Sequence, residues 1–207
     1  MHSVIRWYCL SSLALLALLT APSALAAKCS YATNTKDKFT KETTVQTDWN
    51  SLHGLFDFSS DSDFTMSISA YAPNDEQYLI VKISAMKFSD TKPRAYELED
   101  LIVVSEGASL MVMMKDESVV ELIASQRRSA RTHVLKPNAG SNITDNYVID
   151  YDIDARYVLD AESAEALSAQ DATHIRVVSD NKNYDIEIHK RSVGDIRNAV
   201  GCIQQAE

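Results

Sequence analysis

The sequence has 207 residues, of which 20 are lysine or arginine and 29 are aspartate or glutamate, so the formal net charge is −9. Such an acidic surface repels polyanions, which excludes nucleic acid as the expected partner. With only five glycines, four prolines and 45% hydrophobic residues, the composition is that of a folded chain rather than a disordered one.

Residues 1–26 have the three-part organisation of a secretory signal peptide. Arg6 makes the start basic, Leu10 to Leu19 form a short apolar core, and Ala24-Leu25-Ala26 supplies the small-x-small exit that a signal peptidase needs. An uncleaved anchor needs about 20 strongly apolar residues, and here serine, proline and alanine interrupt the run too early. We therefore expect cleavage, a periplasmic or secreted protein, and no stable membrane insertion after signal cleavage.

The cysteines predict a disulfide between the two ends of the exported part. Cys9 leaves with the leader, so that Cys29 and Cys202 remain. Export leads to an oxidising compartment, where paired thiols form disulfides. A redox-active pair normally has Cys-x-x-Cys spacing, so we expect a structural Cys29–Cys202 bridge. Loop-closure entropy gives it an upper stabilisation of about 5 kcal/mol.

The exported part begins with segments of strand character. A short edge strand is expected over 28–34 and a second strand over 42–49, which is rich in threonine, valine and tryptophan. Residues 64–70 alternate apolar and polar side chains, the pattern of a strand with one buried face. The turn at 72–75 returns the chain into a strand over 77–85, so the pair predicts an antiparallel hairpin.

Further strands and two helices follow along the chain. The polar segment 127–142 contains proline and glycine and predicts a long loop or a linker between two lobes. Asp160 can cap a helix over 160–169. Apolar residues at helical spacing from Val193 to Ile203 predict a C-terminal amphipathic helix. The remaining strands are expected over 101–104, 110–114, 119–125, 147–159, 173–178 and 184–189.

This order of elements defines the expected fold. Strands joined by short turns pair antiparallel. We predict an α+β, mainly β fold: one or more antiparallel sheets, or a sandwich, of about ten short strands, with two helices in the C-terminal third. The expected organisation is a signal peptide over 1–26 and a single β-rich domain over 27–207, with two lobes as the alternative.

Both ends of the exported part carry short motifs. They are Cys29-x-Tyr31, Phe39-Thr40 and Thr44-Val45-x-Thr47 at the start, and Ile175-Arg176-Val177, Tyr184-Asp185-Ile186 and Cys202 at the end. This pattern resembles small exported bacterial proteins of unknown role. The resemblance implies location and fold, and it supplies no site.

Two charged clusters are candidate binding sites. Asp150, Asp152 and Asp154 alternate along one expected strand, so their carboxylates face the same way, about 6.5–7 Å apart. Three such groups can contribute to a calcium site, although the same pattern also fits an ordinary strand with one solvated face.

The second cluster is basic. It consists of Arg127, Arg128 and Arg131 in the expected loop. It can meet an anionic partner such as a phosphate or an acidic protein surface, and the alternative is a solvated charge run.

The common catalytic motifs are missing from the sequence. Neither Gly-x-Ser-x-Gly, His-Glu-x-x-His nor a glycine-rich phosphate loop occurs, and three Ser-x-x-Lys matches fall in an expected strand, connector and turn rather than at the start of a helix. We therefore expect a non-enzymatic binding protein without a cofactor. Its expected partner is another protein, met at an exposed strand edge or sheet face. A small cell-envelope hydrolase and a small-ligand carrier stay open as alternatives.

Overall fold

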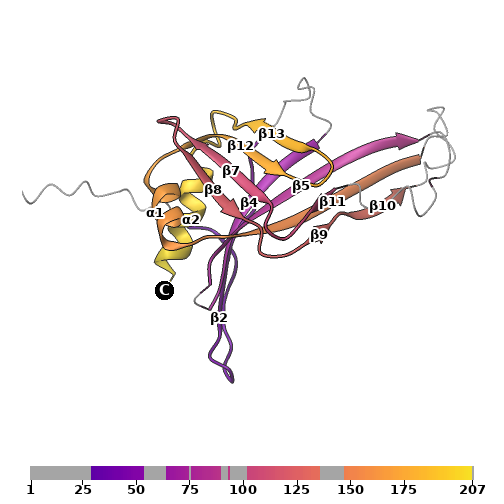
Figure 1. Ribbon diagram of the computed structural model, residues 1–207. Coiled ribbons are helices and arrows are strands. Elements are labelled where there is room, and N and C mark those ends of the chain that lie inside the picture. The colour runs from indigo at the N-terminus through magenta and orange to yellow at the C-terminus, as the bar shows by residue number, and fades with distance from the viewer. Residues whose placement is uncertain are drawn as a thin grey trace, which may run out of the picture.

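The computed structural model describes residues 29–53, 64–74, 76–89, 93, 102–135 and 147–206. The predicted signal peptide lies outside these residues. Antiparallel strands dominate and both helices lie in the C-terminal third, which confirms the mainly β, α+β fold (Figure 1). The elements are β1 (Tyr31–Lys36), β2 (Thr43–Thr47), β3 (Asn50–Ser51), β4 (Phe64–Pro73), β5 (Tyr78–Ser89), β6 (Val103–Val104), β7 (Ser109–Met114), β8 (Val119–Ile123), β9 (Arg128–Ser129), β10 (Arg131–Leu135), β11 (Tyr147–Val158), α1 (Ala161–Ala169), β12 (Ala172–Val178), β13 (Asn183–Glu187) and α2 (Asp195–Gln205).

The larger sheet has the strand order β1-β2-β4-β5-β11-β10, with β3 also paired to β4. Every pairing in it is antiparallel. The alternation in β4 buries Met66 and Ile68, and their partners across the ladder, Ile83 and Val81 on β5, are buried as well. One face of this sheet is therefore apolar, while the other carries mainly polar side chains.

The smaller sheet has the order β13-β12-β7-β8 and lies across one face of the larger sheet (Figure 1). Its inner side chains, such as Val112 on β7 and Ile175 on β12, are buried. Phe64 of the larger sheet and Tyr184 of the smaller one meet edge to face, with ring centroids 5.0 Å apart. The inner faces of both sheets contribute to one hydrophobic cluster.

The two helices pack side by side at one end of the molecule (Figure 1). Asp160 caps α1 as expected, because its Oδ1 accepts a hydrogen bond from the Ser163 amide at 2.8 Å. Leu167 on α1 and Val200 and Ile203 on α2 are fully buried in the core cluster. Neither of these described helices is long and apolar enough to cross a membrane.

A disulfide joins Cys29 to Cys202, as the sequence predicts, with the two Cα atoms 5.6 Å apart across a sequence separation of 173 residues. The Tyr31 hydroxyl donates a hydrogen bond to the Cys202 carbonyl at 3.1 Å. The start of β1 is therefore held to α2 by one covalent bond and one hydrogen bond.

The prediction of a loop over residues 127–142 is wrong for the first half of this segment. Arg128–Ser129 forms β9, which pairs with β6 in a two-stranded sheet, and Arg131–Leu135 forms β10, which pairs with β11. The composition of this segment is polar, but the long strand β11 offers its edge, and ladder hydrogen bonds outweigh the weak local preference. The remainder, 136–142, lies outside the described residues.

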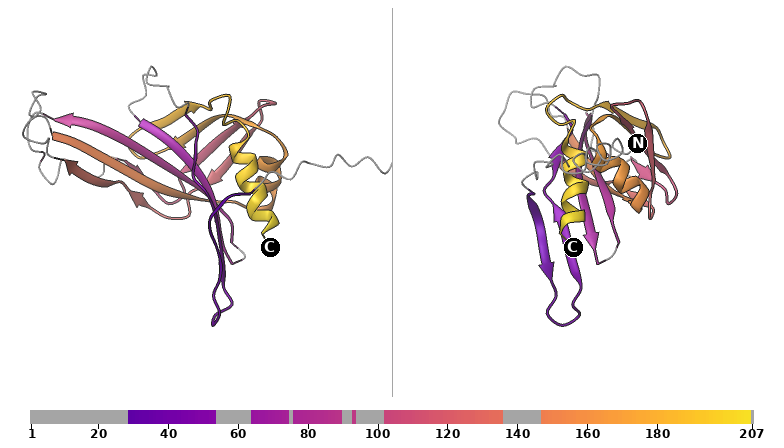
Figure 2. Two further views of the ribbon diagram at one scale, coloured as in Figure 1. Left: turned by 180° about the vertical axis from the view of Figure 1, so that it is seen from behind. Right: turned by 90° about the vertical axis from the view of Figure 1, so that its left-hand side faces the viewer.

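Two parts project from the sandwich. The hairpin of β1 and β2 extends to one side, and the ends of β5, β11 and β10 extend together away from the helices (Figures 1 and 2). In the hairpin, β1 pairs only with β2 among the described strands.

Replacing both Cys29 and Cys202 with serine should lower the free energy of unfolding by about 3–5 kcal/mol, because the unfolded chain regains the entropy that the bridge removes. The corresponding drop in Tm is roughly 10 °C, measured by circular dichroism. The wild type melted with a reductant is the control and should behave like the double variant. Equal melting of the oxidised wild type and the variant would contradict a stabilising role.

Asp160→Ala should lower Tm at pH 7, because it removes the α1 cap. Hydrogen bonding from the Ser163 amide lowers the pKa of Asp160, so the stabilisation is present above the unfolded pKa of about 3.9 and is lost as the pH falls through the lower folded value. The Tm difference from the wild type should therefore shrink as the pH falls below the unfolded pKa of Asp160. Asp160→Asn, which keeps an acceptor, should fall between the two, and a difference independent of pH would contradict this account.

Candidate functional site

The acidic stripe and part of the basic cluster that the sequence singles out meet in the structure. Asp150, Asp152 and Asp154 share the outward face of β11, whereas Ile149 and Ile153 are buried on the other face. Across the ladder, β10 places Arg131 opposite Asp152. Arg131 Nη2 lies 2.5 Å from Asp152 Oδ2 and 2.9 Å from Asp154 Oδ2.

This ion pair changes the interpretation of both clusters. Hydrogen bonding and charge from Asp152, together with the charge of Asp154, raise the pKa of Arg131. One guanidinium therefore contacts two of the three carboxylates and offsets one of their negative charges. Within the described part of the chain, no group of three or more His, Cys, Asp or Glu side chains is arranged to hold a metal ion.

The other two arginines do not join Arg131 at that position. Arg128 lies in β9, where Nη2 reaches the side-chain amide of Gln126 at 2.7 Å. Arg127, exposed in the connection before β9, also has a partner within the protein. Both arginines thus make contacts within the protein, Arg128 in β9 and Arg127 in the connection before β9.

The pKa shifts of the described residues have structural causes. Backbone amides of Thr40 and Phe39 lower the pKa of Asp37. Burial raises the pKa of Tyr184 to about 12 and also raises that of Asp195. Turn formation and packing explain these shifts without an acid–base pair.

Ser179 and Lys182, one of the three Ser-x-x-Lys matches, are also placed by local structure. The Ser179 hydroxyl donates to the Lys182 carbonyl at 2.6 Å and so closes a turn, while Lys182 Nζ lies 4.7 Å from the centre of the Tyr184 ring. The register of β12 and β13 sets Glu187 opposite His174. These residues therefore stabilise the end of the smaller sheet.

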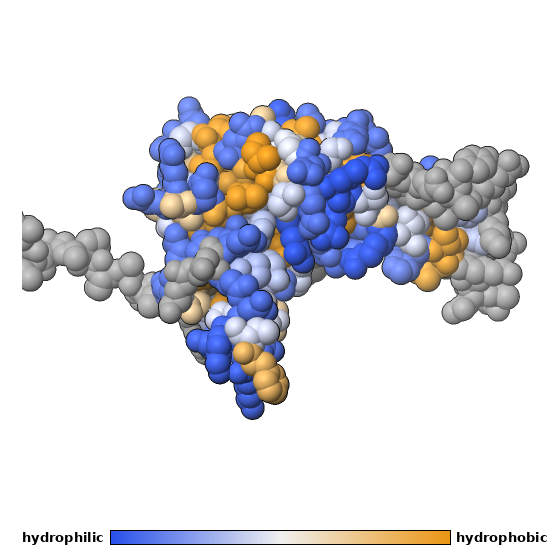
Figure 3. All heavy atoms as spheres, turned by 60° about the horizontal axis from the view of Figure 1, so that its bottom comes forward, coloured by the Kyte–Doolittle hydropathy of each residue, from blue (hydrophilic) through white to orange (hydrophobic). Residues whose placement is uncertain are grey.

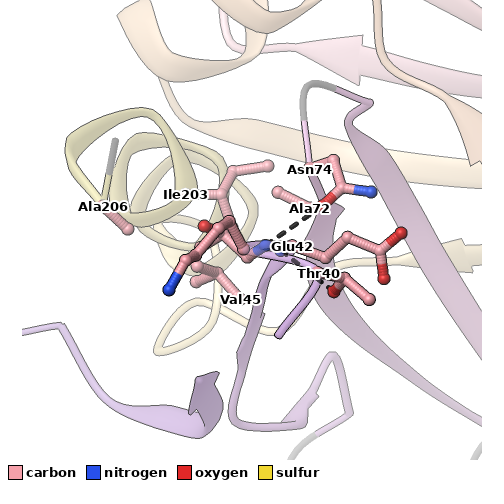
Figure 4. Close-up of a pocket in the computed structure, with 9 residues that line it drawn as sticks. Thr40, Glu42, Val45, Ala72, Asn74, Ile203 and Ala206 are labelled. Carbon is pink, nitrogen blue, oxygen red and sulfur yellow. Dashed lines mark hydrogen bonds between the residues drawn. The ribbon is translucent and has the colours of Figure 1, made fainter. Parts of the chain in front are cut away.

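A pocket of about 490 Å³ lies between the hairpin and the C-terminal end of α2 (Figure 4). It is lined by Thr40, Lys41, Glu42, Thr43, Val45, Ala72, Asn74, Ile203 and Ala206. Asn74 Oδ1 accepts from the Thr43 amide at 3.0 Å, and the Glu42 carboxylate is directed away from Ile203. The polar atoms of this pocket therefore serve the hairpin turn rather than converging on a common point.

The remaining candidate is the edge strand β8. The larger and smaller sheets end at β1, β10, β13 and β8. Native proteins protect such edges with charges or proline, because unpaired backbone groups attract other strands. The first three edges each carry exposed charged residues, such as Lys36, Arg131 and Asp185. By contrast, β8 contains neither lysine, arginine nor proline, and it exposes 55% of Val119 and 44% of Ile123.

The charge in β8, Glu121, is turned toward the neighbouring strand. Its carboxylate accepts a short hydrogen bond from the hydroxyl of Ser109 on β7. The β8 edge therefore carries one exposed charge, Glu121, whose carboxylate is hydrogen-bonded within the sheet, and no lysine that could protect the edge.

The backbone of β8 alternates between its partner and the free edge. Hydrogen bonds from Met114 to Ser118 and from Ala124 to Ala108 bracket the β7–β8 ladder. Because bonded and non-bonded positions alternate in an antiparallel pair, Val119, Glu121 and Ile123 direct their amide and carbonyl groups outward. Among the described strands, only β7 forms a ladder with β8. Directly after Ile123, the chain meets β11 through the Ala124–Tyr157 bridge and through the Ser125 amide, which donates to the Arg156 carbonyl at 2.9 Å, so the free edge lies at Val119 and Glu121.

A shallow groove of about 400 Å³ continues from this edge over the outer face of the smaller sheet. Register places Val119 beside Met113, and Met113 beside His174. The groove is lined by Met111, Met113, Val119, His174, Ile175, Arg176, Asp185, Ile186 and Glu187. Methionine side chains adapt to different apolar partners, so the groove offers a soft apolar floor beside the open edge.

An ion pair closes the far side of the groove. Arg176 Nε and Nη2 donate to the two carboxylate oxygens of Asp185 at 2.6 and 3.2 Å. This bidentate geometry fixes the guanidinium across β12 and β13. The β8 edge and the groove together, defined by Val119, Glu121, Ile123 and the groove lining, are called the β8 surface below.

The β8 surface was not predicted from the sequence, although the strand β8 itself was. Residues 119–125 were expected to form a strand, but no local pattern shows that a strand ends a sheet. The absence of lysine and proline from β8 is the signal that could have indicated an unprotected edge.

Neither a family model, nor a curated protein, nor a solved structure matches this chain at a significant level.

Replacing Arg131 with methionine should destabilise the protein by less than about 1 kcal/mol, because the ion pair with Asp152 and Asp154 is largely exposed. Urea unfolding at low salt measures the loss. In 1 M salt, where the Debye length is about 3 Å, the loss should shrink. A loss that salt leaves unchanged would indicate packing rather than charge.

Proposed function

We propose that this is an exported, non-enzymatic protein that binds an extended segment of another protein along the β8 surface. The observation that supports it is the edge strand β8, which exposes Val119 and Ile123 and lacks the lysine or proline that would block strand addition. The disulfide is consistent with the oxidising compartment that the predicted leader implies.

The backbone supplies the basic mode of binding. Strand addition uses main-chain hydrogen bonds for affinity and alternate side chains for specificity. The outward amides and carbonyls of Val119 and Glu121 would pair with the incoming segment, because the chain directly after Ile123 already meets β11. Its side chains on the groove side would pack beside Val119 and Met113.

The charges around the surface define the preferred partner. Glu121 and Glu187 flank the apolar floor, whereas the positive charge of Arg176 is paired with Asp185. The whole chain is also acidic, with a net charge of −9. A segment that alternates apolar residues with lysine or arginine would therefore associate fastest and fit best.

The experiment uses peptides selected on the oxidised protein from an unbiased peptide library. Selected peptides should alternate apolar and basic residues. Glu121→Pro removes the outward amide and leaves the bonds to β7, because Glu121 does not donate toward that strand. It should weaken peptide binding at least about tenfold, the effect of losing one or two net hydrogen bonds, measured by isothermal titration calorimetry.

Glu121→Ala is the matched control, since it removes the same carboxylate and keeps the amide. Because it removes one of the charges that attract a basic segment but keeps the backbone hydrogen bond, it should bind the peptides more weakly than the wild type and more tightly than Glu121→Pro. Hydrogen exchange should show peptide-dependent protection of the Val119 and Glu121 amides. Peptides whose binding is unchanged by Glu121→Pro, in a variant with the circular dichroism spectrum of the wild type, would refute strand addition at β8.

A further inference from the structure

The hairpin of β1 and β2 carries a tip, residues 36–42, that stands away from the two sheets (Figures 1 and 2). The last ladder pair joins Lys36 to Thr43, so the turn lies beyond the sheet. In the space-filling view the hairpin is mainly hydrophilic, with an apolar area near its tip (Figure 3). The turn therefore projects beyond the ladder, while Thr40, Lys41 and Glu42 on one side of it line the pocket beside α2.

The base of the hairpin is fixed. The Cys29–Cys202 disulfide and the Tyr31 hydroxyl tie β1 to α2. At the turn end of β2, the Asn74 amide donates to the Thr43 carbonyl at 2.6 Å, and Asn74 Oδ1 accepts from the Thr43 amide. The tip is therefore held at a defined position rather than on a loose loop.

The turn itself is also ordered. Asp37 Oδ1 accepts from the amides of Phe39 and Thr40 at 2.7 and 2.8 Å. Lys41 adopts a left-handed backbone with φ of 66°, and its Nζ donates to the Lys38 carbonyl at 2.7 Å. Because a left-handed lysine is unfavourable, these bonds are what maintains the turn, and the turn keeps Phe39 pointing outward.

Phe39 is exposed over 94% of its surface, more than any other large hydrophobic residue that the structure describes. A phenylalanine gains substantial free energy when it leaves water. The ordered turn therefore presents an exposed aromatic ring that can anchor the protein to an apolar surface. No described residue covers this ring.

Three lysines lie within three positions of Phe39 in the sequence: Lys36, Lys38 and Lys41. The same segment contains Asp37, whose Oδ1 accepts the two turn amides, and Glu42, so the tip has a small positive charge on a chain whose net charge is −9. The tip stands away from the acidic body, and at physiological salt the Debye length is about 8 Å. The acidic body therefore repels an anionic surface only weakly when the hairpin tip approaches that surface first.

We propose that the hairpin tip docks the protein peripherally on an anionic lipid surface, with Phe39 in the headgroup region and the lysines beside lipid phosphates. Aromatic rings and lysines favour this region of a bilayer, where one end is apolar and the other charged. A specific protein interface buries about 800 Å² on each partner. A seven-residue tip offers far less than that, which favours a lipid surface over a protein partner. This proposal does not depend on the β8 surface.

The test measures binding to vesicles that contain phosphatidylglycerol and to vesicles of phosphatidylcholine alone. The full chain is expressed with its own leader, and the processed, oxidised product is purified. It should sediment with the anionic vesicles and not with the neutral ones. Lys36→Gln and Lys38→Gln should each lower the partition coefficient about fivefold, and Phe39→Ser should lower it about tenfold.

Leu135→Ser is the matched control, because Leu135 is exposed over 52% of its surface on β10, outside the hairpin. It should partition as the wild type does. Equal binding of wild type and Phe39→Ser to anionic vesicles would overturn the proposal, as would equal binding to both vesicle types. A photo-crosslinker at residue 39 that captures one protein, without any vesicle binding, would overturn it in favour of a protein partner.

Discussion

The continuous antiparallel pairing of β5 with β11 is the interaction on which the rest of the structure depends. Both strands are 12 residues long, and the register runs unbroken from the Tyr147–Ser89 pair to the Val158–Tyr78 pair. Its inner face contributes Val81, Ile83 and Ile153 to the core. The smaller sheet packs over this face, and β4 and β10 extend the ladder on either side. A one-residue slip would turn the buried set outward, so this register also fixes which side chains reach solvent.

Strand register also determines which charged side chains lie opposite one another. On the outer side of β11 the ladder sets Arg131 against Asp152, and in the smaller sheet it sets Arg176 against Asp185. Cross-strand ion pairs of this kind contribute little stability at an exposed site. Their larger effect is on recognition, because each pair removes a charge that a ligand would otherwise meet. The basic residues outside such pairs are then the ones available to a partner.

The sequence predicted the elements whose own residues carry a strong pattern. The alternation in β4, the Asp160 cap and the apolar spacing of α2 are local, so the fold class and both helices could be read directly. Strands β9 and β10 were missed because their stability comes from partners rather than from composition. The ion pair of Arg131 with Asp152 depends on a register between segments 21 residues apart, and the open edge at β8 depends on the order of strands in a sheet. Neither property is local, so neither could be predicted from a single sequence.

The disulfide has a consequence for the order of events in folding. Cys29 and Cys202 are 173 residues apart, so Cys29 is synthesised long before its partner. The bond that holds the base of the hairpin can therefore close only after α2 has been made. A chain that stops before α2 keeps Cys29 without this partner, so the bridge chemically distinguishes molecules that contain both sheets and α2 from shorter ones.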